Sequence, residues 1–155
     1  MKLLAIPAIL AGIAQGRPTE IKGRDTCPFT TVVPDNASYQ EGTNFVLTWN
    51  PDNLPPGTID LQVQSSLAVP IIVGYGINIH GQTVPIYDFK VAYKKLGTPN
   101  LEDRTFTWQV ELIGNATGPE YVYLISGYFT LQYNPPNGPT TDYCTTSNFH
   151  VSAAL

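Results

Sequence analysis

The chain has 155 residues, with 8 Lys and Arg against 12 Asp and Glu and a formal net charge of −4. This balance argues against a nucleic-acid-binding protein, because a phosphate backbone requires basic partners. Only 13% of the residues are charged, beside 14 Pro and 13 Gly. Such a composition is typical of an extracellular domain with many turns and unlike that of a helical cytosolic protein.

Residues 1–16 have the features of a secretory signal peptide. Met1 and Lys2 supply a charged start, and the apolar run at residues 3–14 follows. Small residues place the cleavage site after Gly16, with cleavage after Ala14 as the alternative. A membrane-spanning helix needs about 20 apolar residues, so we expect a secreted protein with no membrane span. Cleavage leaves 139 residues with a net charge of −5, which is the size of one domain.

The mature chain divides into a short polar segment and one domain. We predict a flexible lead-in at residues 17–26 and a single β-sandwich domain at residues 27–155. The only two cysteines, Cys27 and Cys144, enclose nearly all of that domain. An oxidising compartment favours a disulfide between them, and two free buried thiols are the alternative. Without a Cys-x-x-Cys motif we expect no redox chemistry.

Two sequons predict N-glycosylation at Asn36 and Asn115. Each lies beside turn residues and lacks a blocking proline, so both loops are expected at the surface of a secreted glycoprotein.

Alternation of apolar and polar residues predicts β-strands along the chain. It is clearest at residues 45–49, 59–63 and 106–110, and Trp49 and Trp108 are expected to face the core. Prolines and glycine at residues 50–57 predict a loop. Further strands rich in β-branched and aromatic residues are predicted at residues 70–73, 77–80, 84–93, 121–125, 128–133 and 148–151.

About seven to nine short strands without intervening helices favour antiparallel sheets packed face to face. We therefore predict an all-β, immunoglobulin-like or fibronectin-like β-sandwich closed by one disulfide, and a closed barrel is the alternative. Residues 134–139 predict a loop before the last strand. Residues 74–76 predict either a bulge or an exposed hairpin tip.

Several segments in order resemble the N-terminal domain of fungal Ser/Thr-rich GPI-anchored cell-wall proteins, a domain shared with yeast proteins of β-1,6-glucan assembly. The similar positions are residues 30–34, Tyr39, Gly42, and residues 45–49, 59–63, 106–110, 121–125 and 147–151. The resemblance implies an immunoglobulin-like domain at a fungal cell surface that organises wall polysaccharide and has no defined catalytic residues.

The sequence also departs from this family. The Ser/Thr-rich stalk and hydrophobic tail used for GPI attachment do not follow the last predicted strand, so we expect a protein that is released or held non-covalently. Residues 67–95 are also longer and more apolar than the family pattern.

The sequence contains little that indicates catalysis. His80 and His150 lie far apart and in no metal-binding spacing, so we expect no metal, cofactor or catalytic site. A small hydrolase would need two of the carboxylates across a cleft, and the sequence does not pair them. The candidate carboxylates are Asp60, Asp88, Glu102, Asp103, Glu111 and Glu120.

Aromatic residues favour binding instead, because their flat apolar faces and polar edges suit stacking on sugar rings. The tyrosines that we predict as ligand-stacking candidates are Tyr75, Tyr87, Tyr93, Tyr128 and Tyr133. The leading hypothesis is a non-enzymatic extracellular or cell-wall-associated protein whose partner is β-glucan or another wall protein. The alternative is a secreted carbohydrate-binding or host-directed, effector-like protein.

Overall fold

Alternating side chains produce strands throughout the part of the chain that the computed structural model describes, residues 27–52, 54–130 and 141–154. The predicted signal peptide (residues 1–16), the lead-in (residues 17–26), the loop at residues 134–139 and Tyr133 lie outside it. The elements are β1 (Ser38–Gln40), β2 (Asn44–Thr48), β3 (Ile59–Leu67), β4 (Ile71–Ile77), β5 (Thr83–Asp88), β6 (Ala92–Gly97), a 3₁₀ turn (Leu101–Asp103), β7 (Thr105–Gln109), β8 (Tyr121–Thr130), β9 (Thr141–Thr145) and β10 (His150–Ser152).

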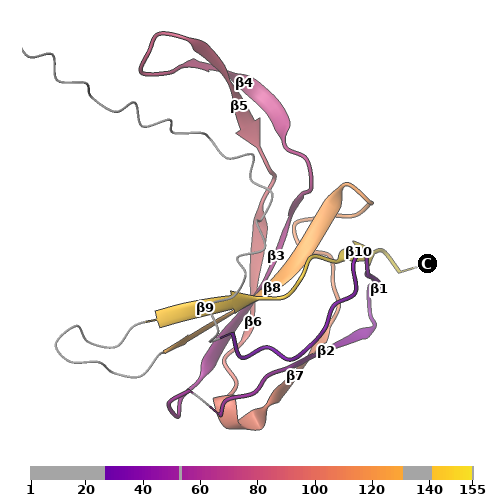
Figure 1. Ribbon diagram of the computed structural model, residues 1–155. Coiled ribbons are helices and arrows are strands. Elements are labelled where there is room, and N and C mark those ends of the chain that lie inside the picture. The colour runs from indigo at the N-terminus through magenta and orange to yellow at the C-terminus, as the bar shows by residue number, and fades with distance from the viewer. Residues whose placement is uncertain (1–26, 53, 131–140, 155) are drawn as a thin grey trace, which may run out of the picture.

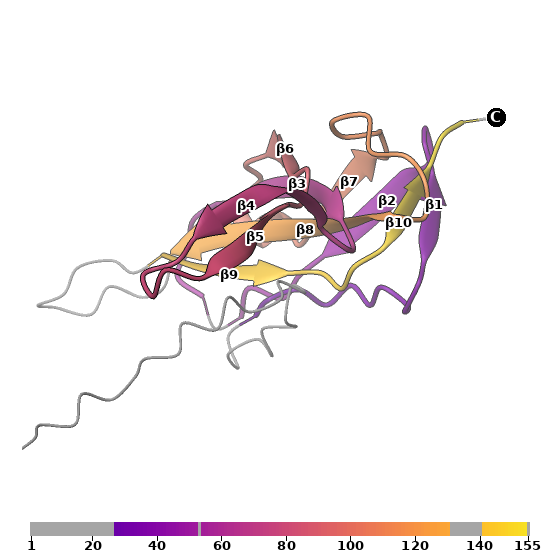
Figure 2. The ribbon, with the colours of Figure 1, turned by 90° about the horizontal axis from the view of Figure 1, so that it is seen from above.

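Four antiparallel strands in the order β6-β3-β8-β9 form the largest sheet, and β2 pairs antiparallel with β7. The short strands β1 and β10 run parallel, side by side at one end of the fold (Figure 2). No described strand joins β6 to β7, so the sheets do not close into a barrel. The fold is all-β and sandwich-like, as predicted.

The core lies between the β2–β7 pair and the four-stranded sheet. Leu47 of β2, Val63 of β3 and Ile125 of β8 are almost completely buried in it, and Phe149 stacks on Phe45 with ring centroids 5.3 Å apart. Trp49 and Trp108 are also buried, which confirms their predicted orientation. Side chains from both layers thus share one apolar cluster, the arrangement that stabilises a two-layered domain.

One strand pairing and one buried tyrosine resemble features of immunoglobulin-like sandwiches. In that fold the second strand pairs with the fifth, and a tyrosine on the sixth bonds back to the backbone upstream. When the β4–β5 hairpin is left out of the count, β7 is the fifth strand of this chain and β8 is the sixth. Here β2 pairs with β7, and Tyr123 of β8 donates a hydrogen bond to the carbonyl oxygen of Ala116. The disulfide between Cys27 and Cys144 is present as predicted. It ties β9 to the segment before β1, which pairs with the end of β2 through Phe29 and Trp49.

Several predicted strand boundaries differ from the structure. The two strands predicted at residues 121–125 and 128–133 are one strand, β8, because Gly127 lies against Ile59 and Phe29 and continues the ladder. The strand predicted at residues 84–93 is broken into β5 and β6, since Lys90 has a positive φ of 49°. Such a φ interrupts extended backbone.

Residues 74–76 lie inside β4 and are not a hairpin tip. The register of β4 and β5 shifts between Ile72 and Gly74, which places a bulge beside this element. The two strands form a hairpin that projects beyond the ends of β3 and β6 (Figure 1). The structure has no helix long and apolar enough to cross a membrane within the described residues.

Candidate functional site

The outward face of the four-stranded sheet carries aromatic and amide side chains, and we call it the tyrosine face. Leu61 and Val63 point into the core, so the alternating residues of β3 point outward. Directly opposed residues share a face, which places their cross-strand partners there too. The tyrosine face consists of Asp60, Gln62, Gln64, Tyr93, Lys95, Tyr128, Tyr143 and Thr145.

Tyr128 and Tyr143 form a pair of neighbouring rings on this face. They lie opposite each other on β8 and β9, with ring centroids 5.9 Å apart and planes inclined by 31°. Both are accessible, with 39% and 46% of their surfaces exposed. The sequence predicts a stacking role for Tyr128 and does not distinguish Tyr143. Alternation next to the buried Cys144 was the signal that would have identified Tyr143 as an outward residue.

Tyr93 stands at the far side of the same face. It is 60% exposed and lies opposite Gln64 on β3, while Tyr128 lies opposite Asp60. Four residues along the strands and two strand spacings separate Tyr93 from Tyr128 by roughly 16 Å. Half-buried Gln62 and Gln64 lie between them and offer both donors and acceptors.

The carboxylate of Asp60 is paired on this face and is not available as a catalytic acid. Its Oδ1 accepts hydrogen bonds from Thr98 Oγ1 at 2.6 Å and from Lys95 Nζ at 3.0 Å. The Thr98 hydroxyl first, and then the Lys95 ammonium, lower the pKa of Asp60. The pair leaves the tyrosine face polar, without an unpaired charge at Asp60.

The remaining predicted stacking residues do not join this face. Tyr75 and Tyr87 lie on the β4–β5 hairpin, where Tyr75 is 68% exposed. Tyr133 lies outside the described residues. The five predicted tyrosines are therefore divided between two surfaces, and Tyr143 completes the group on the sheet.

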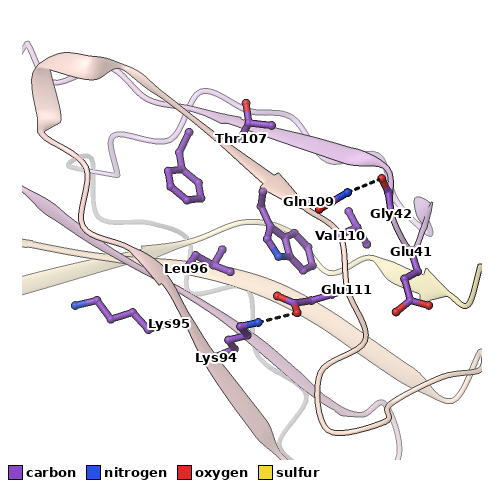
Figure 3. Close-up of a pocket in the computed structure, with 11 residues that line it drawn as sticks. Glu41, Gly42, Lys94, Lys95, Leu96, Thr107, Gln109, Val110 and Glu111 are labelled. Atoms are coloured by element: carbon purple, nitrogen blue, oxygen red, sulfur yellow. Dashed lines mark hydrogen bonds and ion pairs between the residues drawn. The ribbon is translucent and has the colours of Figure 1, made fainter.

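A groove of about 540 Å³ opens between β6 and β7 (Figure 3). Phe106, Trp108 and Leu96 contribute apolar lining, and Lys94 forms an ion pair of 2.7 Å with Glu111 at its rim. The indole nitrogen of Trp108 is buried and has no hydrogen-bond partner among the described residues. None of Tyr93, Tyr128 and Tyr143 lines the groove, so we describe it separately from the tyrosine face.

The carboxylates and histidines that catalysis would require are dispersed, and most of them already form hydrogen bonds or ion pairs. Asp103 accepts from the backbone of Asn100 and thereby caps the 3₁₀ turn. His150 Nδ1 lies 2.8 Å from the carbonyl oxygen of Tyr121, whereas His80 is exposed at the hairpin end. No cluster of three potential metal ligands occurs within the described ranges.

Both predicted glycosylation positions occupy exposed turns. Asn36 and Asn115 have positive φ angles of 58° and 59°, a conformation that asparagine tolerates well. The residue after each asparagine faces inward, since Ala37 is half-buried and Ala116 is in the core. Both asparagines are themselves exposed, as a glycan attachment site must be.

The fold and the tyrosine face define a β-sandwich-like domain with one disulfide and an accessible aromatic sheet face. No protein-family model, curated protein or solved structure matches the chain. The resemblance to fungal cell-wall proteins therefore remains a prediction from the residues quoted above.

Proposed function

We propose that this protein is a secreted, non-enzymatic glycoprotein that associates with the cell wall by binding neutral polysaccharide, a β-glucan, on its tyrosine face. The observation that carries the proposal is the neighbouring pair Tyr128–Tyr143, with Tyr93 on the same face. Exposed aromatic rings supply apolar area for stacking on sugar rings, and their hydroxyls remain available for hydrogen bonds.

The polar residues between the rings support a neutral polyhydroxylated ligand. Gln62 and Gln64 provide amide groups that donate and accept, as sugar hydroxyls do. The Asp60–Lys95 pair balances its own charge, so an anionic ligand gains little there. The span of roughly 16 Å from Tyr93 to Tyr128 is longer than one sugar ring, which favours an extended chain over a monosaccharide.

Secretion is supported by the predicted signal peptide and by the disulfide, because disulfides persist in oxidising compartments. Glycosylation is supported by the exposure of Asn36 and Asn115. A wall location agrees with the family resemblance and with a chain of low charge density.

Retention of the glycosylated protein on insoluble β-1,3-glucan, β-1,6-glucan and chitin tests the proposal. We expect saturable retention on a glucan, and a Tyr128→Ala/Tyr143→Ala variant should lose most of it. The matched control is Tyr75→Ala/Tyr87→Ala, which removes two exposed tyrosines from the hairpin. Equal retention of both variants, or no retention of the parent protein on any polymer, would overturn the proposal.

A further inference from the structure

The β4–β5 hairpin is a separate feature of the surface, and we call residues 69–87 the arm. The chain enters it from β3 and returns to β6, and a hydrogen bond of 2.7 Å from Leu67 N to Phe89 O closes its base. Among the described strands, β4 and β5 pair only with each other. An isolated two-stranded hairpin is marginal in water, so the arm lacks the partner layer that the other strands have.

The arm is apolar and exposed. Residues 61–87 contain no Asp, Glu, Lys or Arg. Its exposed apolar side chains are Val69, Ile71, Ile72, Val73, Tyr75, Ile77, Ile79, Ile86 and Tyr87. Nine side chains exposed to this extent present more than the few hundred Å² of apolar surface at which a patch marks an interaction site.

The two edges of the arm differ. Ladder hydrogen bonds alternate along an antiparallel pair, and Asn78 bonds inward to Gln82. The backbone groups of the next opposed pair, Ile77 and Thr83, therefore point outward, as do those of Tyr75 and Pro85. Proline has no N–H, and prolines on edge strands block pairing with further strands. The β5 edge is thus interrupted by Pro85. The β4 edge carries outward N–H groups at Tyr75 and Ile77, on the tip side of the bulge between Ile72 and Gly74.

The two faces also differ. Ile72, Tyr75, Ile77 and Tyr87 share one face by their register and are about half to three-quarters exposed. On the other face the side chain of Ile86 lies over Gly76, 3.6 Å from where a Cβ would be. The first face consequently has the larger uncovered apolar area.

We propose that the arm joins a second copy of this chain, with β4 pairing antiparallel to β4 of the partner. A two-fold axis makes this contact self-complementary, and it produces a four-stranded sheet with the order β5-β4-β4-β5. The apolar faces of both arms then lie together on one sheet. This inference is independent of the polysaccharide proposal, because it uses no residue of the tyrosine face.

Electrostatics favours this partner arrangement. The mature chain is acidic, so two copies repel each other when their sandwiches are close. In the antiparallel pairing the two sandwiches lie at opposite ends of the joined arms. The seven residues of β4 span roughly 23 Å, which exceeds the Debye length of about 10 Å at 0.1 M ionic strength.

Sedimentation velocity of the purified chain across the micromolar range tests the proposal. We expect a concentration-dependent dimer, and Ile77→Pro should raise its dissociation constant at least about tenfold by removing an outward N–H from the β4 edge. The matched control is Thr83→Pro, which makes the same change at the opposed position on the β5 edge and should preserve the dimer. Circular dichroism verifies that both variants retain the sandwich.

A second variant protects the test against a local effect of proline. Tyr75→Lys leaves the hairpin backbone intact, places two like charges at the two-fold contact and should also prevent dimerisation. A parent protein that stays monomeric would overturn the proposal. This outcome counts against the dimer even if the monomer sediments with phosphatidylcholine vesicles, that is, even if the arm binds a lipid surface instead. A dimer that survives both Ile77→Pro and Tyr75→Lys would overturn it equally.

Discussion

The hydroxyl of Tyr123 lies 2.6 Å from the carbonyl oxygen of Ala116, to which it donates, and it accepts a hydrogen bond from the backbone N–H of Ile113 at 3.2 Å. These two bonds tie the loop after β7 to the first part of β8. Because Ala116 is held in the core, the preceding Asn115 is turned outward. One buried phenol therefore positions both the strand and the predicted glycosylation loop.

Replacing Tyr123 with phenylalanine should destabilise the protein by about 1–3 kcal/mol, because a buried carbonyl and a buried N–H lose their partner. Urea denaturation at neutral pH measures the free energy of unfolding. Tyr143→Phe, which removes an exposed hydroxyl, should leave it nearly unchanged. Equal effects of the two substitutions would contradict this account.

The same residue should make the fold sensitive to alkaline pH. Burial raises the pKa of Tyr123, so the folded state holds the proton more tightly than the unfolded chain does. This contribution is fully present below the unfolded pKa of about 10 and is lost as the pH rises through the folded value. Tyr123→Phe should therefore lose less stability than the parent on alkaline titration, and an identical decline in both would refute the assignment.

Gly127 is required where β8 passes beneath Phe29 and Ile59. A Cβ at this position would lie 2.7 Å from Phe29 Cζ and 2.6 Å from Ile59 Cδ1. Gly127→Ala should consequently lower the free energy of unfolding by about 1–3 kcal/mol through overpacking. Gly74→Ala is the control, since nothing lies within 4 Å of its Cβ position. Thermal unfolding of both variants decides the point.

The disulfide should contribute much of the stability of the domain. Cys27 and Cys144 are 117 residues apart in sequence, and closing a loop of this length stabilises by about 4–5 kcal/mol in the chain-entropy model. A Cys27→Ala/Cys144→Ala variant should unfold at much lower urea concentration than the oxidised parent. Reduction of the parent with a thiol reagent should reproduce the loss, and an unchanged midpoint after reduction would count against it.

Thr98 should control the ionisation of Asp60 on the tyrosine face. Its hydroxyl is the main cause that lowers the carboxyl pKa, followed by Lys95. Thr98→Val should raise the pKa of Asp60 towards its ordinary value, as measured by NMR titration of the side-chain carbon. The stability contributed by Asp60 is present above its unfolded pKa and is lost as the pH falls through the lower folded value. Thr107→Val, on β7, should not move this titration.

Local sequence patterns predicted much of the framework. Alternation identified β2, β3 and β7 and the inward direction of Trp49 and Trp108, because period-two alternation is a property of a single strand. The disulfide followed from there being only two cysteines. Strand ends were predicted less well, since Gly127 and Lys90 act through their tertiary surroundings and backbone conformation.

The sequence by itself determined that this chain forms strands, buries its tryptophans and closes with one disulfide. Only the tertiary structure decided that Tyr128 meets Tyr143 on a sheet while Tyr75 and Tyr87 stand apart on an exposed arm. The physical reason is that hydrophobic alternation is local, whereas strand order depends on pairings between distant residues. Composition likewise shows an apolar segment at residues 61–87, but whether a layer covers it depends on where the rest of the chain lies.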